Sequence, residues 1–185
     1  QSSLLNEYPR SIIPNGLFLD RFKPLDKKVA RQILGLPQGR QFILFGAVSS
    51  IANPQKGFHF LRGAIERLSK SPQHKNVDVV VFGNNKRPQE DLPVPAHYLG
   101  PLTDDVTLSL AYSAADVMVV PSLQEAFGKT IIEAMACRTP VVAFDTGGPS
   151  DIIEHHKSGY LSKSISPEGL MEGILWTIAD PDRLQ

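Results

Sequence analysis

The sequence predicts an α/β fold, a Rossmann-like parallel sheet with helices on both faces. Short, continuously apolar runs recur along the chain, and stretches with apolar residues at helical spacing lie between them. Continuous apolar strands that alternate with amphipathic helices are typical of a parallel sheet covered on both sides. The 185 residues suit a single domain, and a content of 42% apolar residues suffices for a core without disulfides or metals.

In the first half of the chain, two strands and one helix are expected. Residues 42–45 are continuously apolar and are followed by Gly46, which is typical of a buried strand. Residues 57–70 place apolar side chains three and four positions apart, which predicts a helix. Residues 77–82 are rich in valine and are closed by Gly83, which predicts a second strand.

The second half continues the same alternation. A helix is expected to begin at 103–105, where a capping residue and early acids precede apolar positions. The elements expected after it are a strand at 117–120, a helix at 130–137, a strand at 140–144, a short helix at 150–156 and a longer helix at 166–179.

Composition and charge exclude several classes of partner. Nineteen Lys and Arg residues balance nineteen Asp and Glu residues, so there is no basic field to attract nucleic acid. No apolar run approaches the roughly 20 residues of a membrane-spanning helix, and the N-terminus lacks a signal-peptide pattern. Cys137 is the one cysteine and cannot form an internal disulfide, so we expect a cytoplasmic protein. Because the chain begins with Gln1, we expect it to be part of a longer protein.

Ligands of parallel sheets bind beyond the carboxyl ends of the strands, where loops lead into helix N-termini. The stretch 121–136 is the richest candidate, with Glu125 in a loop, Gly128 at the start of a helix and Glu133 within it. A helix N-terminus favours an anion, and eight residues at helical rise would separate the two carboxylates by about 12 Å. A nucleotide diphosphate sugar has hydroxyls at both ends and phosphates between. Taken alone, however, two such glutamates are more often solvated surface carboxylates.

The run 121–136 resembles the signature of glycosyltransferase family 4, a group with the two-domain GT-B fold in which two glutamates mark the donor site. Further motifs of that family occur in family order between residues 12 and 161. They are Ile13-Pro14-Asn15-Gly16 followed by Asp20 and Phe22-Lys23-Pro24, then Lys56-Gly57, Tyr98-Leu99-Gly100, Ser113-Ala114-Ala115-Asp116-Val117, Thr139-Pro140-Val141-Val142-Ala143 and Gly147-Gly148.

The resemblance implies that residues 1–185 are one half of a GT-B fold, the C-terminal donor-binding domain, without the N-terminal acceptor domain. It implies a retaining glycosyltransferase of the hexosyltransferase class that takes a nucleotide diphosphate sugar, with no cofactor and no obligatory metal. The acceptor would be a sugar, a lipid-linked sugar or another molecule, in glycan or polysaccharide synthesis. Peripheral membrane contact would occur only through the missing domain, and the isolated domain is expected to be inactive.

Roles are carried over to the matching positions of this sequence. Glu125 would contact the sugar, Glu133 the ribose hydroxyls, and Lys56 the departing phosphate, so Glu125 and Lys56 are the expected catalytic residues. Backbone N–H groups at 127–130 would hold phosphate, and main-chain groups of the loop 98–102 would flank the base. The expected donor-binding residues are Gly46, Gly57, Leu99, Phe127, Gly128, Lys129, Thr130 and Glu133.

Three positions depart from the family pattern. Gly46 is followed by Ala47, where arginine is common, so part of the usual positive charge for the pyrophosphate is missing there. Arg138 stands where glycine is usual, and Asp151 stands where glutamate commonly follows the paired glycines.

Two alternatives remain beside the transferase. Residues 128–130, Gly-Lys-Thr, copy the end of a P-loop, but Leu123 occupies the position of its first glycine, which makes an NTPase the weaker alternative. The stronger alternative is a module that binds a nucleotide or phosphate and transfers nothing. The adjacent His155 and His156 have no accompanying ligand cluster, and no metal site is expected.

Overall fold

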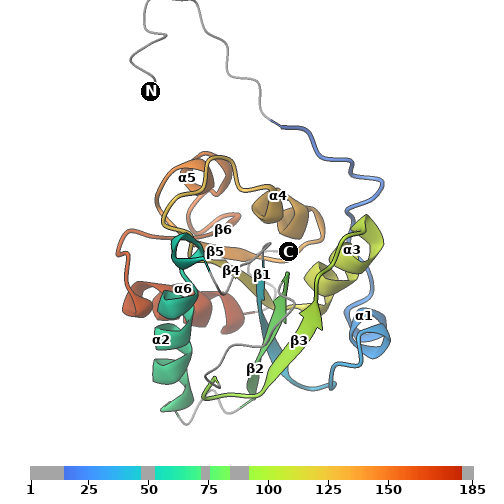
Figure 1. The fold of residues 1–185 in the computed structure, drawn as a ribbon, viewed down its shortest axis with the longest axis horizontal. Helices are drawn as coiled ribbons and strands as arrows, with labels where there is room; N and C mark the ends of the chain where they lie inside the picture. The colour runs from blue at the N-terminus through green and yellow to red at the C-terminus, as the bar shows by residue number, and fades with distance from the viewer. Residues whose placement is uncertain (1–14, 47–52, 72–75, 84–91, 181–185) are drawn as a thin grey trace, which may run out of the picture.

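Six strands form one sheet in the order β3-β2-β1-β4-β5-β6 (Figure 1). The computed structural model describes residues 15–46, 53–71, 76–83 and 92–180. Every neighbouring pair of strands is parallel, which confirms the predicted Rossmann-like sheet. The strands are β1 (Gln41–Gly46), β2 (Val77–Phe82), β3 (Ala96–Gly100), β4 (Val117–Val120), β5 (Val141–Phe144) and β6 (Gly159–Ser162).

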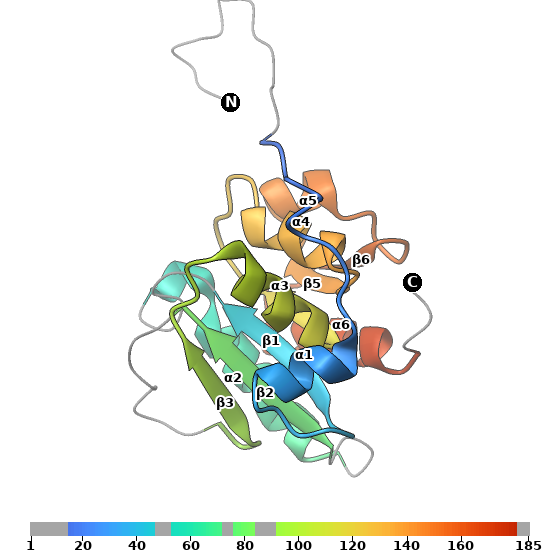
Figure 2. The same cartoon turned by 90° about the vertical axis from the view of Figure 1, so that its right-hand side faces the viewer.

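Helices cover both faces of the sheet (Figure 2). Two of them, α2 and α6, pack together on one face, and α1, α3 and α4 lie on the other. The helices are α1 (Lys27–Ile33), α2 (Phe58–Ser69), α3 (Asp105–Ala114), α4 (Lys129–Ala136), α5 (Gly148–Ile152) and α6 (Pro167–Ile178), with a 3-10 turn η2 at Pro54–Lys56. The core is therefore two apolar layers with the strands between them.

The helices begin in two different ways. Side chains cap α1, α3 and α6, where Asp26, Asp104 and Ser166 each accept a hydrogen bond from a first-turn N–H group. By contrast, α2 and α4 begin after Gly57 and Gly128, both in the left-handed region, and no described side chain caps either helix. Their first N–H groups therefore stay unpaired within the helix and face the carboxyl ends of the strands.

The predicted helix at 150–156 is wrong in its bounds. The helix α5 occupies Gly148–Ile152, and Ile153 already has extended backbone. Pro149 fixes the first turn of α5, which explains the early start. Beyond it, His155 forms a β-bridge with Gly159, and His156 adopts a left-handed conformation with φ +66°.

The structure also contains α1, β3 and β6, which the apolar pattern does not indicate. Both β3 and β6 are edge strands of the sheet, and β3 is half-buried along its whole length. An edge strand needs no continuous apolar run. The sequence Tyr98-Leu99-Gly100, expected in a loop beside the base, is the end of β3.

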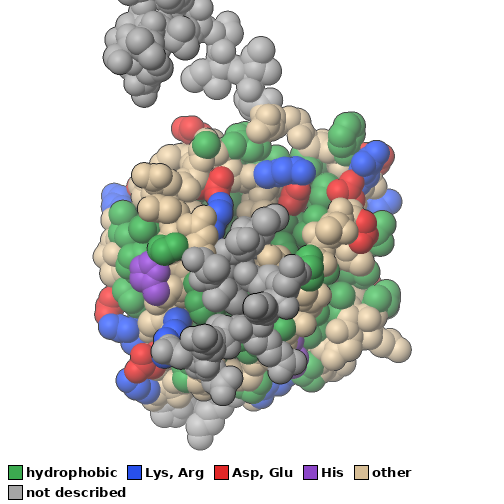
Figure 3. Space-filling model, in the orientation of Figure 1, with side chains coloured by type: hydrophobic (Ala, Val, Ile, Leu, Met, Phe, Trp, Pro, Cys, Tyr) green, Lys and Arg blue, Asp and Glu red, His purple; other side chains and the backbone are tan. Residues whose placement is uncertain are grey.

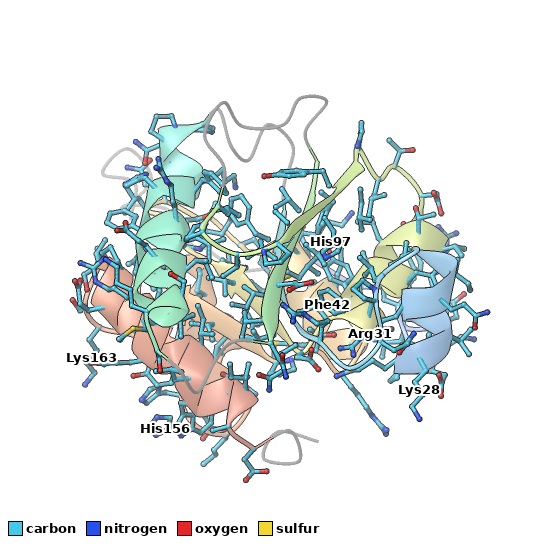
Figure 4. The ribbon with its side chains drawn as sticks, turned by 90° about the horizontal axis from the view of Figure 1, so that it is seen from below. Lys28, Arg31, Phe42, His97, His156 and Lys163 are labelled. Atoms are coloured by element: carbon cyan, nitrogen blue, oxygen red, sulfur yellow. The ribbon has the colours of Figure 1, made fainter. Side chains whose placement is uncertain are left out.

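Asp116, which directly precedes β4, joins three elements at the amino ends of the strands. Its Oδ2 accepts hydrogen bonds from the Phe42 N–H group and the Arg31 guanidinium, both at 2.7 Å. Its Oδ1 accepts one from Lys27 Nζ at 2.9 Å. The Arg31 guanidinium also lies over the Phe42 ring, 4.8 Å from its centroid (Figure 4). The motif 113–117 therefore contains a residue that holds α1 against the sheet.

Replacing Asp116 with alanine should destabilise the fold by about 2–4 kcal/mol, because it leaves the nearly buried Arg31 guanidinium without its carboxylate. The free energy of unfolding from urea titration measures this loss. Glu66→Ala is the matched control, since Glu66 pairs with Lys70 on the helix surface, and it should change stability by about 0.5 kcal/mol or less. Equal losses in the two variants would contradict the structural role of Asp116.

His155 accepts a hydrogen bond that only its neutral form can accept. The Leu161 N–H group donates to His155 Nδ1 at 3.1 Å, so that nitrogen carries no proton. Burial lowers the pKa of His155, and the charges of His156 and Lys163 lower it further, against a smaller opposite effect of Asp145. The ring of His156 stacks on those of His155 and Trp176, with centroids 3.7 and 4.6 Å apart. Protonation of His155 therefore opposes the local fold around β6.

Stability should depend on pH through His155. Its contribution is fully present above the ordinary histidine pKa of 6.5 and is lost as the pH falls from there through the lowered pKa of the folded state. In that window, unfolding should take up a fraction of a proton more than in His155→Asn, whose side-chain oxygen keeps an acceptor and does not titrate. Unfolding free energies at several pH values measure the slope. If the unfolding free energy changes with pH equally in the unmodified protein and in His155→Asn, His155 does not contribute to the pH dependence.

Candidate functional site

The candidate site lies between the carboxyl ends of β1 and β4. Chain connections from these two strands run in opposite directions across the sheet, which is where ligands of open parallel sheets bind. A pocket opens there between the end of β1, the η2 turn and the loop that leads from β4 into α4. It is lined by Phe45, Gly46, Lys56, Val119, Val120, Pro121, Ser122, Glu125 and Thr130.

Lys56 and Glu125 form an ion pair in this pocket. Lys56 Nζ donates to Glu125 Oε2 at 2.9 Å, although 69 residues separate them in the chain. The side chains are 26% and 19% exposed, so the pair is shielded from water but reachable. The sequence places Lys56 after one strand and Glu125 in the loop after another. The structure brings the two side chains into direct contact.

Two backbone contacts hold the loops that supply this pair. Gly57, with φ +70°, packs so tightly on the Pro121 carbonyl group that an added Cβ would overlap the oxygen. The Leu123 N–H group donates to the Gln55 carbonyl oxygen at 2.9 Å. Because these contacts lie on both sides of Lys56 and before Glu125, they fix the positions from which the two side chains reach each other.

The N-terminus of α4 is open toward the same loop. Gly128 has φ +93°, and the first helical N–H groups, those of Lys129 and Thr130, have no partner within the helix. Unpaired N–H groups and the helix dipole favour an anion there. Of the expected donor-binding residues, Phe127, Gly128, Lys129 and Thr130 all belong to this turn, and Thr130 also lines the pocket.

The paired glycines 147 and 148 shape the loop that contains Glu125, a role the sequence does not reveal. The Gly148 N–H group donates to the Glu125 carbonyl oxygen at 2.8 Å. A Cβ on Gly147 would lie 2.7 Å from that same oxygen, and a Cβ on Gly148 would overlap the Phe127 carbonyl group. Side chains at these positions would displace the loop, so the Gly-Gly motif is a spatial requirement.

Glu133 is buried, which contradicts the alternative of a solvated surface carboxylate. Its side chain is 4% exposed, and its Oε2 accepts a hydrogen bond from the Tyr112 hydroxyl at 2.7 Å. Its Oε1 lies 3.4 Å from Lys129 Nζ. Burial raises the pKa of Tyr112, and the negative charge of Glu133 raises it further. The tyrosine therefore stays protonated and donates to the carboxylate.

Other expected positions lie elsewhere. Leu99 is in β3, two strands away from β1, and does not line the pocket. Arg138 follows α4 at the opposite end of the sheet, with φ +58°, a conformation that explains why glycine suits this position. Asp151 is exposed in α5. The segment after Gly46, where arginine is missing, and the first part of the 13–16 motif lie outside the described residues.

A second hollow, at the amino ends of the strands, is lined by Lys27, Asp116 and Arg138 among others. Lys27 and Asp116 are already paired with each other there. Within the described residues, no group of three or more His, Cys, Asp or Glu side chains is arranged to hold a metal ion. None of the described helices is long and apolar enough to span a membrane.

A family model described as "Glycosyl transferases group 1" matches residues 42–180. A D-inositol 3-phosphate glycosyltransferase of Segniliparus rotundus is 36% identical over 185 residues, covering 94% of this chain and 40% of the relative. D-inositol 3-phosphate glycosyltransferase 2 of Catenulispora acidiphila is 33% identical over 188 residues, covering 94% of this chain and 43% of the relative. The chain thus spans about two fifths of the length of these curated relatives.

Solved structures share the fold. Sucrose-phosphate synthase from Thermosynechococcus elongatus superposes with a TM-score of 0.77 at 29% identity, over 92% of this chain and 44% of that one. Anabaena Alr3699/HepE, in complex with UDP-glucose, superposes with a TM-score of 0.73 at 26% identity, over 91% of this chain and 48% of that one.

Gly57→Ala should be far more harmful than an alanine at a glycine with the same backbone but open surroundings. Gly35 has φ +66° and nothing within 4 Å of its added Cβ, so Gly35→Ala should cost only about 1 kcal/mol of conformational strain. Gly57→Ala adds a collision with backbone and should cost about 2–4 kcal/mol. Urea unfolding measures both. Similar losses would mean that the Gly57 contact does not constrain the loops.

Proposed function

Because the chain belongs to the glycosyl transferases group 1 family, we propose that it binds a nucleotide diphosphate sugar as the donor half of a retaining hexosyltransferase. The observation that supports this most directly is the Lys56–Glu125 ion pair beside the uncapped N-terminus of α4. A cation and free N–H groups suit a diphosphate, and a carboxylate beside them suits sugar hydroxyls.

In this proposal each group has a separate task. The backbone N–H groups of Lys129 and Thr130 bind the diphosphate, and Lys56 neutralises the charge that develops on the departing phosphate, which is often the largest catalytic contribution. Glu125 accepts hydrogen bonds from the sugar, and Glu133 accepts them from the ribose. No metal is needed for these tasks. The acceptor site belongs to a separate N-terminal domain, so the chain alone binds the donor and transfers nothing.

The ion pair has a consequence for affinity. Glu125 pairs with the Lys56 ammonium group, so a diphosphate must compete with a carboxylate for it. A sugar that hydrogen-bonds to Glu125 would release Lys56 toward the phosphate. The donor sugar and the diphosphate therefore assist each other's binding.

The P-loop alternative loses support from the loop itself. In a P-loop, backbone N–H groups of the glycine-rich turn surround the phosphates. Here the Leu123 N–H group is directed to the Gln55 carbonyl oxygen, and Gly148 N–H binds the Glu125 carbonyl oxygen, so the loop is fixed to its neighbours. A binding module without transfer activity remains the second candidate, and a turnover assay with the full-length protein separates it from the transferase.

Calorimetric titration with UDP and UDP-glucose tests the proposal, UDP-glucose being the ligand named for the Anabaena relative. Lys56→Ala should weaken binding of both ligands by about tenfold to a hundredfold, as expected for a lost charge-assisted hydrogen bond. Glu125→Gln should bind UDP at least as tightly as the unmodified chain, because the competing charge is gone, and should lose preference for UDP-glucose over UDP.

Lys70→Ala is the matched control, since Lys70 pairs with Glu66 on the surface of α2 and should leave both affinities unchanged. If Lys56→Ala behaves like Lys70→Ala, Lys56 is not in the site. If the unmodified chain binds neither UDP nor UDP-glucose, and also no other nucleotide diphosphate sugar, the donor-binding proposal fails.

A further inference from the structure

Tyr112 of α3 is fully buried, yet it places a hydroxyl group beside one of the proposed ligand-binding carboxylates. Its ring is in contact with Phe82 and Phe22, with centroids 6.0 and 6.4 Å away. Its own carbonyl oxygen accepts a hydrogen bond from Thr139 Oγ1 at 2.6 Å. The ring is therefore held from both sides and through its backbone, and the hydroxyl has one fixed position.

From that position the Tyr112 hydroxyl group donates a hydrogen bond to Oε2 of Glu133, at 2.7 Å. The terminal torsion of a glutamate is broad, so a carboxylate without a fixed partner samples many orientations. Here the interior oxygen is held by a buried donor, while Oε1 is 3.4 Å from the ammonium group of Lys129, whose side chain is 71% exposed. The second oxygen is thus the one nearer to an exposed side chain, although Glu133 itself is buried.

We propose that Tyr112 is a positioning residue for nucleotide binding: it holds Oε2 of Glu133 so that Oε1 is directed at the ribose hydroxyls. This inference rests on the proposed function, since it assumes that a ribose reaches Glu133. A hydroxyl donor suits this task better than a buried cation would, because it orients the carboxylate without neutralising it, and the ammonium group near Oε1 belongs to the exposed side chain of Lys129, which a ligand can displace. Packing against Phe82 and Phe22 keeps the Tyr112 hydroxyl group in the same position whether or not a ligand is bound.

The experiment compares UDP with 2′,3′-dideoxy-UDP, which lacks both ribose hydroxyls. The unmodified chain should prefer UDP over the dideoxy compound. Tyr112→Phe keeps the ring and its packing but removes the donor, and it should weaken UDP binding by roughly three- to tenfold. Binding of dideoxy-UDP should not change, because base and diphosphate contacts do not involve Glu133. A merely structural role of Tyr112 would weaken both ligands alike.

Two further variants complete the comparison. Glu133→Gln should lose the preference for UDP as well, and the double variant Tyr112→Phe, Glu133→Gln should lose little more than Glu133→Gln alone, because both act on one contact. Tyr160→Phe is the control, since Tyr160 lies in β6 on the sheet edge away from this pair, and it should keep the preference.

The outcomes separate this inference from the donor proposal. A normal preference for UDP in the Tyr112→Phe variant overturns the positioning role while leaving nucleotide binding intact. Absence of any nucleotide diphosphate binding by the unmodified chain overturns both. Should Tyr112→Phe not fold, a crystal structure of the unmodified chain with UDP decides: ribose hydroxyls on Oε1 with Tyr112 still on Oε2 support the role, and ribose hydroxyls on Oε2 overturn it.

Discussion

The close approach of Gly57 to the Pro121 carbonyl group is the contact on which the candidate site depends. It brings the loop after β1 against the loop after β4, at a distance that no side chain at position 57 permits. Lys56 immediately precedes this contact and Glu125 follows it by four residues, so both charged groups leave the backbone from fixed positions. An ion pair between residues this far apart in the chain forms with a small loss of conformational entropy only when other contacts already fix the backbone.

Charge is distributed differently at the two ends of the sheet. At the amino ends, Asp116 is enclosed by Arg31 and Lys27, and Asp78 by Arg40 and His97, so these groups stabilise the fold and have little left to offer a ligand. At the carboxyl ends, Glu125 is the one carboxylate paired with Lys56 among the described residues, and no described side chain caps α4. Opposite charges also lie next to each other over the face in Figure 3, in keeping with a chain of zero formal net charge.

The sequence predicts the buried half of the fold better than its edges. The strands β1, β2 and β4 are largely apolar because they are covered on both faces, and apolar runs indicate each of them. The edge strand β3, with His97 and Tyr98 half-buried, has no such run, and α5 begins before its predicted start because Pro149 and the glycines before it decide its first turn. Edge strands and short helices owe their form to neighbours that are distant in sequence.

In the candidate site, too, the sequence indicates some features and not others: it indicates the functional residues but not the side chains and backbone groups that contact them. Spacing and motif place Glu125 in a loop after a strand, Gly128 at the start of a helix and Glu133 within that helix, and the structure has them there. The partners of these residues could not be inferred, because each partner comes from another element: Lys56 from the η2 turn, Gly148 from the start of α5, Tyr112 from α3. Apolar spacing indicates that Tyr112 faces the core, but no local pattern tells where its hydroxyl group will find an acceptor.

The two glutamates show why spacing alone does not determine a role. They stand eight positions apart, yet Glu125 pairs with the ammonium group of Lys56, whereas Glu133 is held at Oε2 by the buried Tyr112 hydroxyl and has the exposed Lys129 ammonium group 3.4 Å from Oε1. A displaceable partner makes a carboxylate responsive to what binds beside it, because binding must exchange one ionic contact for another. A buried, fixed partner makes a carboxylate a rigid acceptor of constant direction. The loop before α4 and α4 itself thus hold two carboxylates that differ in how firmly their orientation is fixed.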